Sequence, residues 1–408
     1  MLLKLNAKRV SMRMKKLLFV SVITSYLIAV NVNAAEQDFQ FHGFIAQGLI
    51  DVNGSDLVND DSALSPKLTE IGLNGSYQLS DNLRLAGQVV YLNGGNRYEE
   101  GIRVDYALLD WSAYDSLNWQ TNLYFGRFKN NHWLYSSSRD IPFARPSIIL
   151  PQSIYFDGFR DFAIGADGAA IKIRHHNDDF GNFDFNFTYG TSPVSDKQTE
   201  LLLSDFAQGK AKQDSDMQVS LYWQPSFSAW KFGTSYLDSD FSYQRNDSDD
   251  MFFDADFSFQ SYTLNALYEG EYWEFSSEVS QSNFRTKGFY LPQYDQTPIS
   301  QGIYVQSRYK VTNELTLLAR YEHFYNDKSD KKGKKLTEQT DGKIPAYFGY
   351  HRDTTFGLSY ELTNNLRLRF EYHWVEGAGR LSSLVMPKPD VNDKSNWQLW
   401  AIQLMYWF

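Results

Sequence analysis

The sequence predicts an all-β protein, namely a transmembrane up-and-down antiparallel β-barrel of sixteen strands. Three observations lead to this fold class. The N-terminal segment has the layout of an export signal. The remainder divides into segments of about ten residues in which polar and apolar side chains alternate. The connections between these segments are alternately tight turns and long polar loops, as an up-and-down barrel requires.

The N-terminal segment, residues 1–34, is expected to be a cleaved signal peptide. Its first sixteen residues carry six basic side chains and no acidic one, and an apolar run from Leu17 to Val30 follows. Residues 32–34 read Val-Asn-Ala, which suits cleavage after Ala34. The apolar run is shorter than the roughly 20 residues that a membrane-spanning helix needs. Residues 35–408 are therefore expected to form the barrel domain.

Composition narrows the function classes. The chain without residues 1–34 has a net charge near −16, which makes nucleic acid an unfavourable partner. It has no cysteine, so disulfides, a thiol nucleophile and thiolate metal sites are excluded. Aromatic residues make up 16% of the chain, although its overall hydropathy resembles that of a soluble protein. A barrel with a lipid-facing outer side and a polar lumen combines these properties; a secreted β-sandwich or solenoid is the alternative.

Each strand is assigned from its alternation. In residues 366–374, Leu366, Phe370 and Trp374 share one face, whereas Arg369 and Glu371 share the other, which must meet water. The expected strands are 39–51, 67–79, 83–93, 103–113, 118–128, 161–176, 182–190, 216–224, 229–244, 253–268, 272–285, 298–311, 314–325, 352–362, 366–377 and 396–408.

Proline provides an independent check, because it cannot donate to a strand ladder. All eleven prolines fall in the proposed loops, turns or strand ends. A short helix is expected only near 199–210, inside one of the long loops. Tight turns are expected at 80–82, 312–313 and 364–365, so both termini lie on the periplasmic side.

The C-terminal strand carries the most specific motif in the sequence. Apolar and aromatic side chains occupy every second position up to a terminal phenylalanine: Trp400, Ile402, Leu404, Tyr406 and Phe408. This pattern resembles the signal that the outer-membrane barrel assembly machinery recognises, which implies that machinery as a partner during biogenesis. The other interpretation is an ordinary strand that happens to end the chain.

The third long connection, from Lys129 to Arg160, is the longest and is unusually apolar and rich in proline. With sixteen strands and such a loop, the chain resembles the Gram-negative outer-membrane porin family. The resemblance implies that this loop folds into the barrel and narrows a water-filled channel for passive diffusion of small hydrophilic solutes and ions. The chain lacks the acidic third-loop signature of the best-known general porins, so a solute preference does not carry over.

If the loop lies inside, its apolar residues would anchor it to the wall: Ile148, Ile149, Leu150, Tyr155 and Phe156. Its charged residues would be available to the pore: Arg139, Asp140, Arg145 and Asp157. A cap over the channel mouth, or contact with a neighbouring subunit, is the alternative. The resemblance also implies a homotrimer.

Alternation places a set of basic side chains on the lumen side of the wall: Arg84, Lys172, Arg174, Arg308, Lys310, Arg320, Arg367 and Arg369. Basic rings favour anions. Because Glu322, Glu361 and Glu371 share that side, a mixed field with weak selectivity is equally compatible. Arg320 and Arg369 are the preferred candidates for a direct role, against the interpretation of ordinary solvated wall positions.

Other function classes fit less well. None of the seven histidines lies in a hydrolase or metalloprotease signature, so we expect no enzyme, metal or cofactor. A TonB-dependent receptor would need a plug domain for which the chain is too short. A channel selective for an anion, phosphate or a sugar remains the main alternative to a general porin, and a plugged structural or adhesive barrel is a third. Outer-membrane lipid and lipopolysaccharide are the expected surroundings.

Overall fold

A computed structural model describes residues 39–59, 63–163, 165–204, 206–247, 250–381, 385, 392 and 394–408. The chain separates into two units, residues 1–40 and residues 41–408. The predicted signal peptide and its cleavage point after Ala34 lie outside the described residues. All of the described residues except 39 and 40 belong to the second unit.

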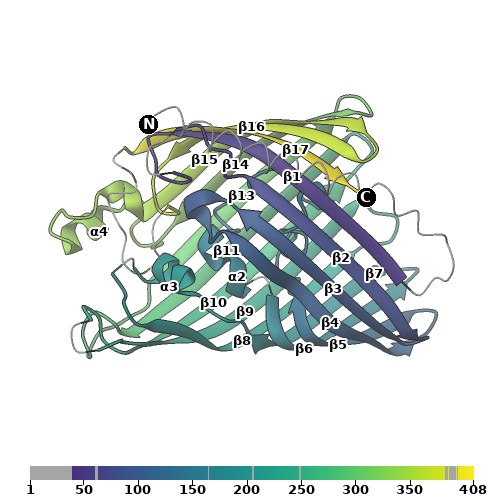
Figure 1. The fold of residues 1–408 in the computed structure, drawn as a ribbon, viewed down its shortest axis with the longest axis horizontal. Coiled ribbons are helices and arrows are strands. Elements are labelled where there is room, and N and C mark those ends of the chain that lie inside the picture. Colours follow the sequence, from purple (N-terminus) through teal and green to yellow (C-terminus); the bar gives the residue numbers. More distant parts are fainter. Residues whose placement is uncertain are drawn as a thin grey trace, which may run out of the picture. The chain divides into compact units, whose positions relative to one another are not determined.

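The second unit is built from long antiparallel strands (Figure 1). Their bounds are β1 Phe39–Asn53, β2 Thr69–Ser80, β3 Leu83–Asn93, β4 Gly101–Asp115, β5 Trp119–Lys129, β6 Gly165–Asn177, β7 Gly181–Thr191, β8 Lys210–Gln224, β9 Trp230–Gln244, β10 Ala255–Glu269, β11 Trp273–Gly288, β13 Ile299–Lys310, β14 Leu315–Tyr325, β15 Tyr350–Thr363, β16 Leu366–Glu376 and β17 Asn396–Trp407. A two-residue piece, β12 Asp295–Gln296, pairs with the end of β11. Among the described residues the wall therefore has the sixteen long strands that the sequence predicts.

The barrel closes through its first and last strands. Ten consecutive residue pairs join β1 to β17, from Phe44 opposite Trp407 to Asn53 opposite Gln398. Each remaining strand pairs with its neighbours in sequence. Closure leaves no row of unsatisfied edge amides, which is the condition for a sheet to stand in lipid. The up-and-down antiparallel barrel that the sequence predicts is confirmed.

The two faces of the wall differ as the alternation predicts. On β16 the side chain of Trp374 is 45% exposed on the outer surface, whereas Arg369 and Glu371 are each 2% exposed. In β17, Leu404 and Tyr406 are exposed and the intervening Met405 is buried. Charged and polar side chains thus point inward and apolar ones outward, the reverse of a water-soluble globule.

An aromatic girdle surrounds half of the barrel near its tight turns. Neighbouring rings contact one another from β5 to β13, with centroid separations such as 3.9 Å between Trp119 and His175 and 4.5 Å between Trp273 and Tyr309. The rings in this girdle are Trp119, His175, Phe183, Trp223, Phe232, Trp230, Tyr268, Phe275, Trp273 and Tyr309. Amphipathic rings favour the level of lipid headgroups, so the girdle marks one membrane interface.

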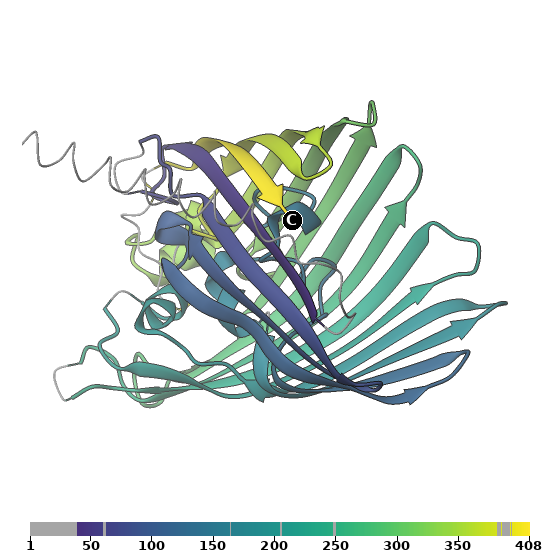
Figure 2. The ribbon, with the colours of Figure 1, turned by 45° about the vertical axis from the view of Figure 1, so that its right-hand side comes forward.

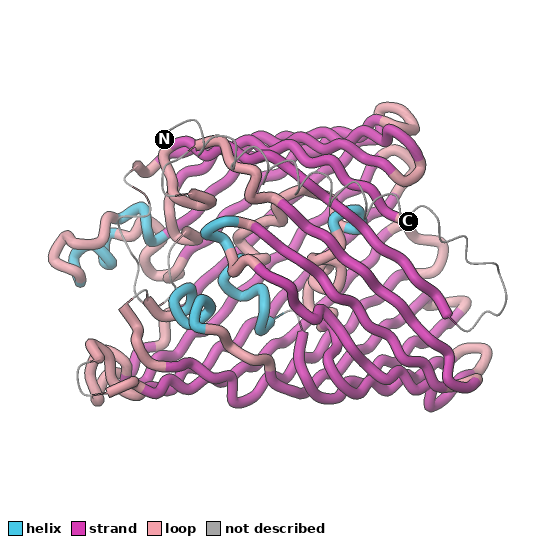
Figure 3. Tube along the Cα trace, viewed as in Figure 1, coloured by secondary structure: helices cyan, strands magenta, loops and turns pink. Residues whose placement is uncertain are grey.

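Helices are short and confined to connections. They are α2 Arg160–Ala163, α3 Asp196–Leu202 and α4 Lys334–Gln339. The helix expected near 199–210 begins earlier, because Ser195 and Gln198 form a reciprocal capping box; α4 was not predicted. No helix in the described part of the chain is long and apolar enough to cross a membrane. In Figure 3 the long loops gather at one end of the barrel and the tight turns at the other.

Candidate functional site

The third loop, residues 130–164, joins β5 to β6 and packs against the inward side chains of the wall. It contains two short 3₁₀ turns, Pro142–Ala144 and Asp157–Phe159, followed by α2. In Figures 1 and 2, α2 lies between the strands of the two opposite walls. The apolar residues expected to anchor the loop are all buried: Ile148, Ile149, Leu150, Tyr155 and Phe156.

Wall carboxylates on β16 and β14 hold the loop by its backbone. Glu371 accepts a hydrogen bond from the amide of Ile148 at 2.5 Å and another from Ile149 at 3.2 Å. Glu322 accepts one from the amide of Ser153 at 2.6 Å. Amide-to-carboxylate bonds are charge-assisted, and here they satisfy loop amides that have no strand partner. These inward acids therefore serve to position the loop.

Glu278 on β11 forms a third anchor. It accepts hydrogen bonds from the hydroxyl of Tyr155, from the Tyr304 hydroxyl at 2.9 Å and from the amide of Leu134 at 3.1 Å. The glutamate is fully buried, together with both tyrosines. Because β11 and β16 are separated by three long strands, the loop is fixed at several points around the wall.

Arg320 and Arg369, the wall residues preferred from the sequence, lie beneath the loop. Arg320 donates to the carbonyl of Ile149 at 3.0 Å, and Arg369 donates to the carbonyl of Pro142 at 2.9 Å. They are 3% and 2% exposed. The alternation placed both arginines on the inner face of the wall, and the loop covers that part of the face.

Arg367, two residues closer to the tight turn than Arg369, is less covered. It donates to the carbonyl of Phe143 at 2.8 Å and pairs with Glu361. Its guanidinium also lies 5.1 Å from the ring centroid of Trp407. The edge of the loop therefore passes over this part of β16 and β17.

The charged residues of the loop, which were expected to be available to the pore, lie in buried ion pairs. Arg139 pairs with Asp157 at 2.7 Å, and Arg145 pairs with Glu70 of β2 at 2.6 Å. Arg139, Arg145 and Asp157 are all buried. The physical reason is that the loop packs on itself and on the wall, so each of these arginines meets a carboxylate of the loop or of β2 where water is scarce.

Asp140 is shared by two cations. It pairs with Lys129 of β5 at 2.9 Å and with Arg160 of α2. Burial opposes its ionisation, but the attraction of Arg160 and Lys129 outweighs that and holds the pKa of the Asp140 carboxyl well below its ordinary value. The ionised Asp140 therefore attaches the loop to Lys129 of β5 and to Arg160 of α2.

A small cavity beside the loop is lined by four arginines, Arg97, Arg139, Arg145 and Arg160, and by only two carboxylates, Glu70 and Asp157. Tyr98 contributes its ring, which lies 4.4 Å from the Arg160 guanidinium. Sequence reasoning missed Glu70, Glu278, Arg97 and Arg160. Alternation within their strands could have identified the two glutamates as inward, but nothing in the pattern showed that the loop would meet them.

The remaining predicted wall residues lie near the tight turns, in ion pairs that are partly open to solvent. Arg84 pairs with Asp110 at 2.7 Å, and Arg308 pairs with Glu274 at 2.6 Å. Arg174 is 3.5 Å from Asp184, and Lys172 lies over the ring of Tyr124 at 4.6 Å. Together with the exposed Lys310, these groups form a mixed field of both signs on the inner wall.

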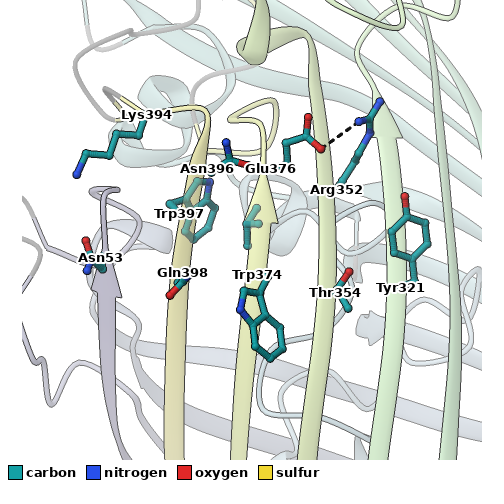
Figure 4. Close-up of a pocket in the computed structure, with 11 residues that line it drawn as sticks. Asn53, Tyr321, Arg352, Thr354, Trp374, Glu376, Lys394, Asn396, Trp397 and Gln398 are labelled. Carbon is teal, nitrogen blue, oxygen red and sulfur yellow. Dashed lines mark hydrogen bonds and ion pairs between the residues drawn. The ribbon is translucent and has the colours of Figure 1, made fainter.

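A separate depression of about 560 Å³ lies at the loop-side ends of β14–β17 and β1 (Figure 4). The side chains of Tyr321 and Trp374 line it from the outer face of the wall, where both are nearly half exposed. Arg352 pairs with Glu376 across it at 3.0 Å, and Lys394 lies at its rim. It is an amphipathic recess on the lipid side and does not belong to the lumen.

Comparison with known proteins places the fold. No family model matches the sequence, and no curated protein matches it either. Solved structures do match. OmpT of Vibrio cholerae in its trimer form has a TM-score of 0.53 at 16% identity, covering 91% of this chain and 99% of that one. An anion-selective porin from Comamonas acidovorans has a TM-score of 0.56 at 11% identity, and the match covers 91% of this chain and 100% of that one. OmpF of Salmonella typhi, in complex with daunomycin, has a TM-score of 0.54 at 12% identity, and the match covers 91% of this chain and 97% of that one. The chain thus shares the fold of Gram-negative porins.

Proposed function

We propose that this chain is an outer-membrane porin, a water-filled channel through which small hydrophilic solutes and ions diffuse passively. The observation that carries this proposal is the arrangement of the lumen. A closed barrel has a polar inner wall, and a long loop is attached to that wall at several points. A sixteen-stranded barrel leaves an aqueous interior that such a loop narrows.

The outer surface supports the location in a membrane. Apolar side chains face outward along the strands, and the aromatic girdle lies near the tight turns. A soluble barrel with this surface would expose far more contiguous apolar area than monomeric proteins tolerate. The C-terminal strand with its terminal Phe408 supports delivery by the barrel assembly machinery.

A channel selective for anions is the second candidate, and one observation favours it. The cavity beside the loop has four arginines against two carboxylates, and one of these arginines, Arg160, also pairs with Asp140, so one positive charge is in excess. Basic linings favour anion entry. One of the matched structures is described as an anion-selective porin. The paired groups near the tight turns favour weak selectivity instead.

Liposome swelling with uncharged sugars of increasing size, followed by reversal potentials under a salt gradient, tests these proposals. A size cut-off with little ion preference supports a general porin. Anion preference that falls in Arg97→Gln supports the selective channel, with Arg285→Gln, an exposed residue on the outer face of β11, as control. Liposomes that admit no solute would refute both.

Assembly as a homotrimer is a further proposal, supported by the matched structure described as a trimer form. Outer-membrane lipid and lipopolysaccharide would surround the barrel. The recess with Trp374 and Lys394 combines aromatic and basic groups at the loop end of the wall, where lipid headgroups would lie.

A further inference from the structure

Three inward side chains on adjacent strands converge at one point of the wall. Glu322 of β14 lies directly opposite Asp353 of β15, and His351 is two residues from Asp353 on the same face. One carboxylate or imidazole atom from each of the three residues lies within 4.8 Å of the others. All three side chains are buried, with exposures of 0–4%.

The hydrogen bonding of this cluster is incomplete. Neither ring nitrogen of His351 has a partner, although the residue is 2% exposed. The Oε1 atom of Glu322 also has none, while its Oε2 accepts from Ser153. A buried polar group without a hydrogen-bond partner costs about 1–3 kcal/mol of stability. Because the His351 ring and Glu322 Oε1 lie side by side without such partners, they point to a bound ligand at this position. We propose that Glu322, His351 and Asp353 bind a divalent transition-metal ion, for which Zn²⁺ is the natural probe.

The donor set selects the class of metal. One imidazole with two carboxylates suits Zn²⁺ and its neighbours, whereas Ca²⁺ and Mg²⁺ prefer oxygen ligands alone. Zinc bonds to nitrogen and oxygen are about 2.0–2.2 Å long, so the three donor atoms must approach one another slightly. Rotation of the long Glu322 side chain supplies that movement, because its Oε1 has no hydrogen-bond partner and its ion pair with Nε of Arg320 is long, at 3.8 Å.

The surroundings fit a cation. Asp353 accepts hydrogen bonds from the imidazole of His373 at 2.7 Å and from the hydroxyl of Thr355 at 3.2 Å. Metal ligands are usually oriented by such hydrogen bonds from neighbouring side chains. Three carboxylates, those of Glu322, Asp353 and Glu371, face the guanidinium groups of Arg320 and Arg380 here. The imidazole of His373 lies between two of these carboxylates, with Nδ1 2.7 Å from Asp353 and Nε2 3.5 Å from Glu371.

A metal bound here would cross-link two strands of the wall next to an attachment point of the loop. It would join β14 to β15 directly beneath Ser153, where the loop is fixed to Glu322. The sequence showed no recognisable motif because the ligands come from two strands that are separated in sequence by the connection 326–349, and strand pairing brings them together. This inference does not depend on conduction, since the binding of metal is measured without any current.

The test uses the full barrel refolded in detergent, stripped of metal with a chelator and titrated with Zn²⁺ in a calorimeter. One Zn²⁺ per chain is expected, with loss of that binding in His351→Ala and Glu322→Gln. His176→Gln is the matched control: it removes an exposed histidine 3.1 Å from Asp178 and should bind like wild type. Replacing His351 breaks no hydrogen bond of its ring.

Absorption spectroscopy at the zinc edge on the wild-type complex provides a second readout that needs no variant. One imidazole nitrogen with oxygen neighbours is the expected ligand shell. Absence of stoichiometric binding, equal binding in all variants, loss only in His176→Gln, or a shell with several imidazoles would each overturn the proposal.

Discussion

Arg145 of the third loop and Glu70 of β2 form a buried two-point ion pair, with Nη1 to Oε1 at 2.9 Å and Nη2 to Oε2 at 2.6 Å. The geometry is the parallel fork that arginine makes with carboxylates. Gln403 of β17 donates to the same carboxylate at 3.0 Å. This pair therefore attaches the loop to the side of the barrel where its first and last strands meet.

Removing one partner of this pair should destabilise the fold. Glu70→Ala leaves the Arg145 guanidinium buried without its counter-charge, and the expected loss is about 3–5 kcal/mol. Denaturant unfolding of the barrel in lipid vesicles measures it. Arg174→Ala, which removes an exposed group 3.5 Å from its partner, should change stability by less than about 1 kcal/mol. Equal effects of the two substitutions would show that Glu70 is not an anchor.

Glu371→Gln should loosen the loop without emptying the space beneath it. The charge-assisted bonds from the amides of Ile148 and Ile149 become neutral ones, which are about half as strong. Single-channel recordings should show more frequent fluctuations of current. Glu361→Gln, near the tight turn and without a bond to a loop amide among those described, is the control. Recordings identical to wild type would mean that the loop is held by other contacts.

The lipid-facing assignment predicts a large penalty for a charge on the outer wall. Leu264 of β10 is 64% exposed and lies away from both strand ends. Leu264→Arg should destabilise the barrel in vesicles by roughly 2–4 kcal/mol. Leu264→Ala serves as the size control and should cost less. A neutral or stabilising effect of the arginine would place that face in water.

Acid should weaken the loop only at low pH. Burial opposes ionisation of Asp157, but Arg97 and Arg139 more than compensate, so the pKa of its carboxyl is lowered. Because the pKa of Asp157 is lower in the folded chain than in the unfolded chain, where it is about 3.9, its ion pairs stabilise the fold fully above that pH. This stabilisation is lost as the pH falls through the pKa of the folded chain. The stability difference between wild type and Asp157→Asn should therefore be constant from about pH 7 to 5 and shrink below about 4. A difference that already declines near pH 6 would contradict this assignment.

The terminal residue should matter for assembly rather than for stability. Phe408→Ala removes the end of the proposed assembly signal. Its ring lies beside the backbone of Gly43 and is 6.1 and 6.2 Å, between centroids, from the rings of Phe41 and Tyr406. Outer-membrane yield in cells should fall severalfold, with refolding in detergent unchanged. Leu79→Ala, another exposed apolar residue near a tight turn, should leave the yield unchanged. Equal outer-membrane yields for the two variants would contradict a role of Phe408 in an assembly signal.

The strands were predictable because two-residue periodicity is local. The pattern in 366–374 alone places Arg369, Glu371 and Trp374 on the correct faces. Where polar residues continued the strand, the pattern was weaker: β8 begins at Lys210, six residues before the predicted start. Bounds of this kind depend on the neighbouring strand, which local patterning does not contain.

The contacts of the loop were not predictable in the same way. Ile148 and Glu371 are separated by 223 residues, and only closure of the barrel brings them together. Alternation identified Arg320 as inward but could not show that a loop carbonyl would cover it. The same reason explains why Glu70, far from the loop in sequence, was missed.

The central claim is that a continuous aqueous path passes the loop, and single-channel current of the wild-type protein in a planar bilayer tests it most directly. We expect discrete, ohmic conductance steps that scale with salt concentration. A bilayer that stays electrically silent while correctly folded barrel is inserted would contradict it and would assign the chain to plugged, structural barrels.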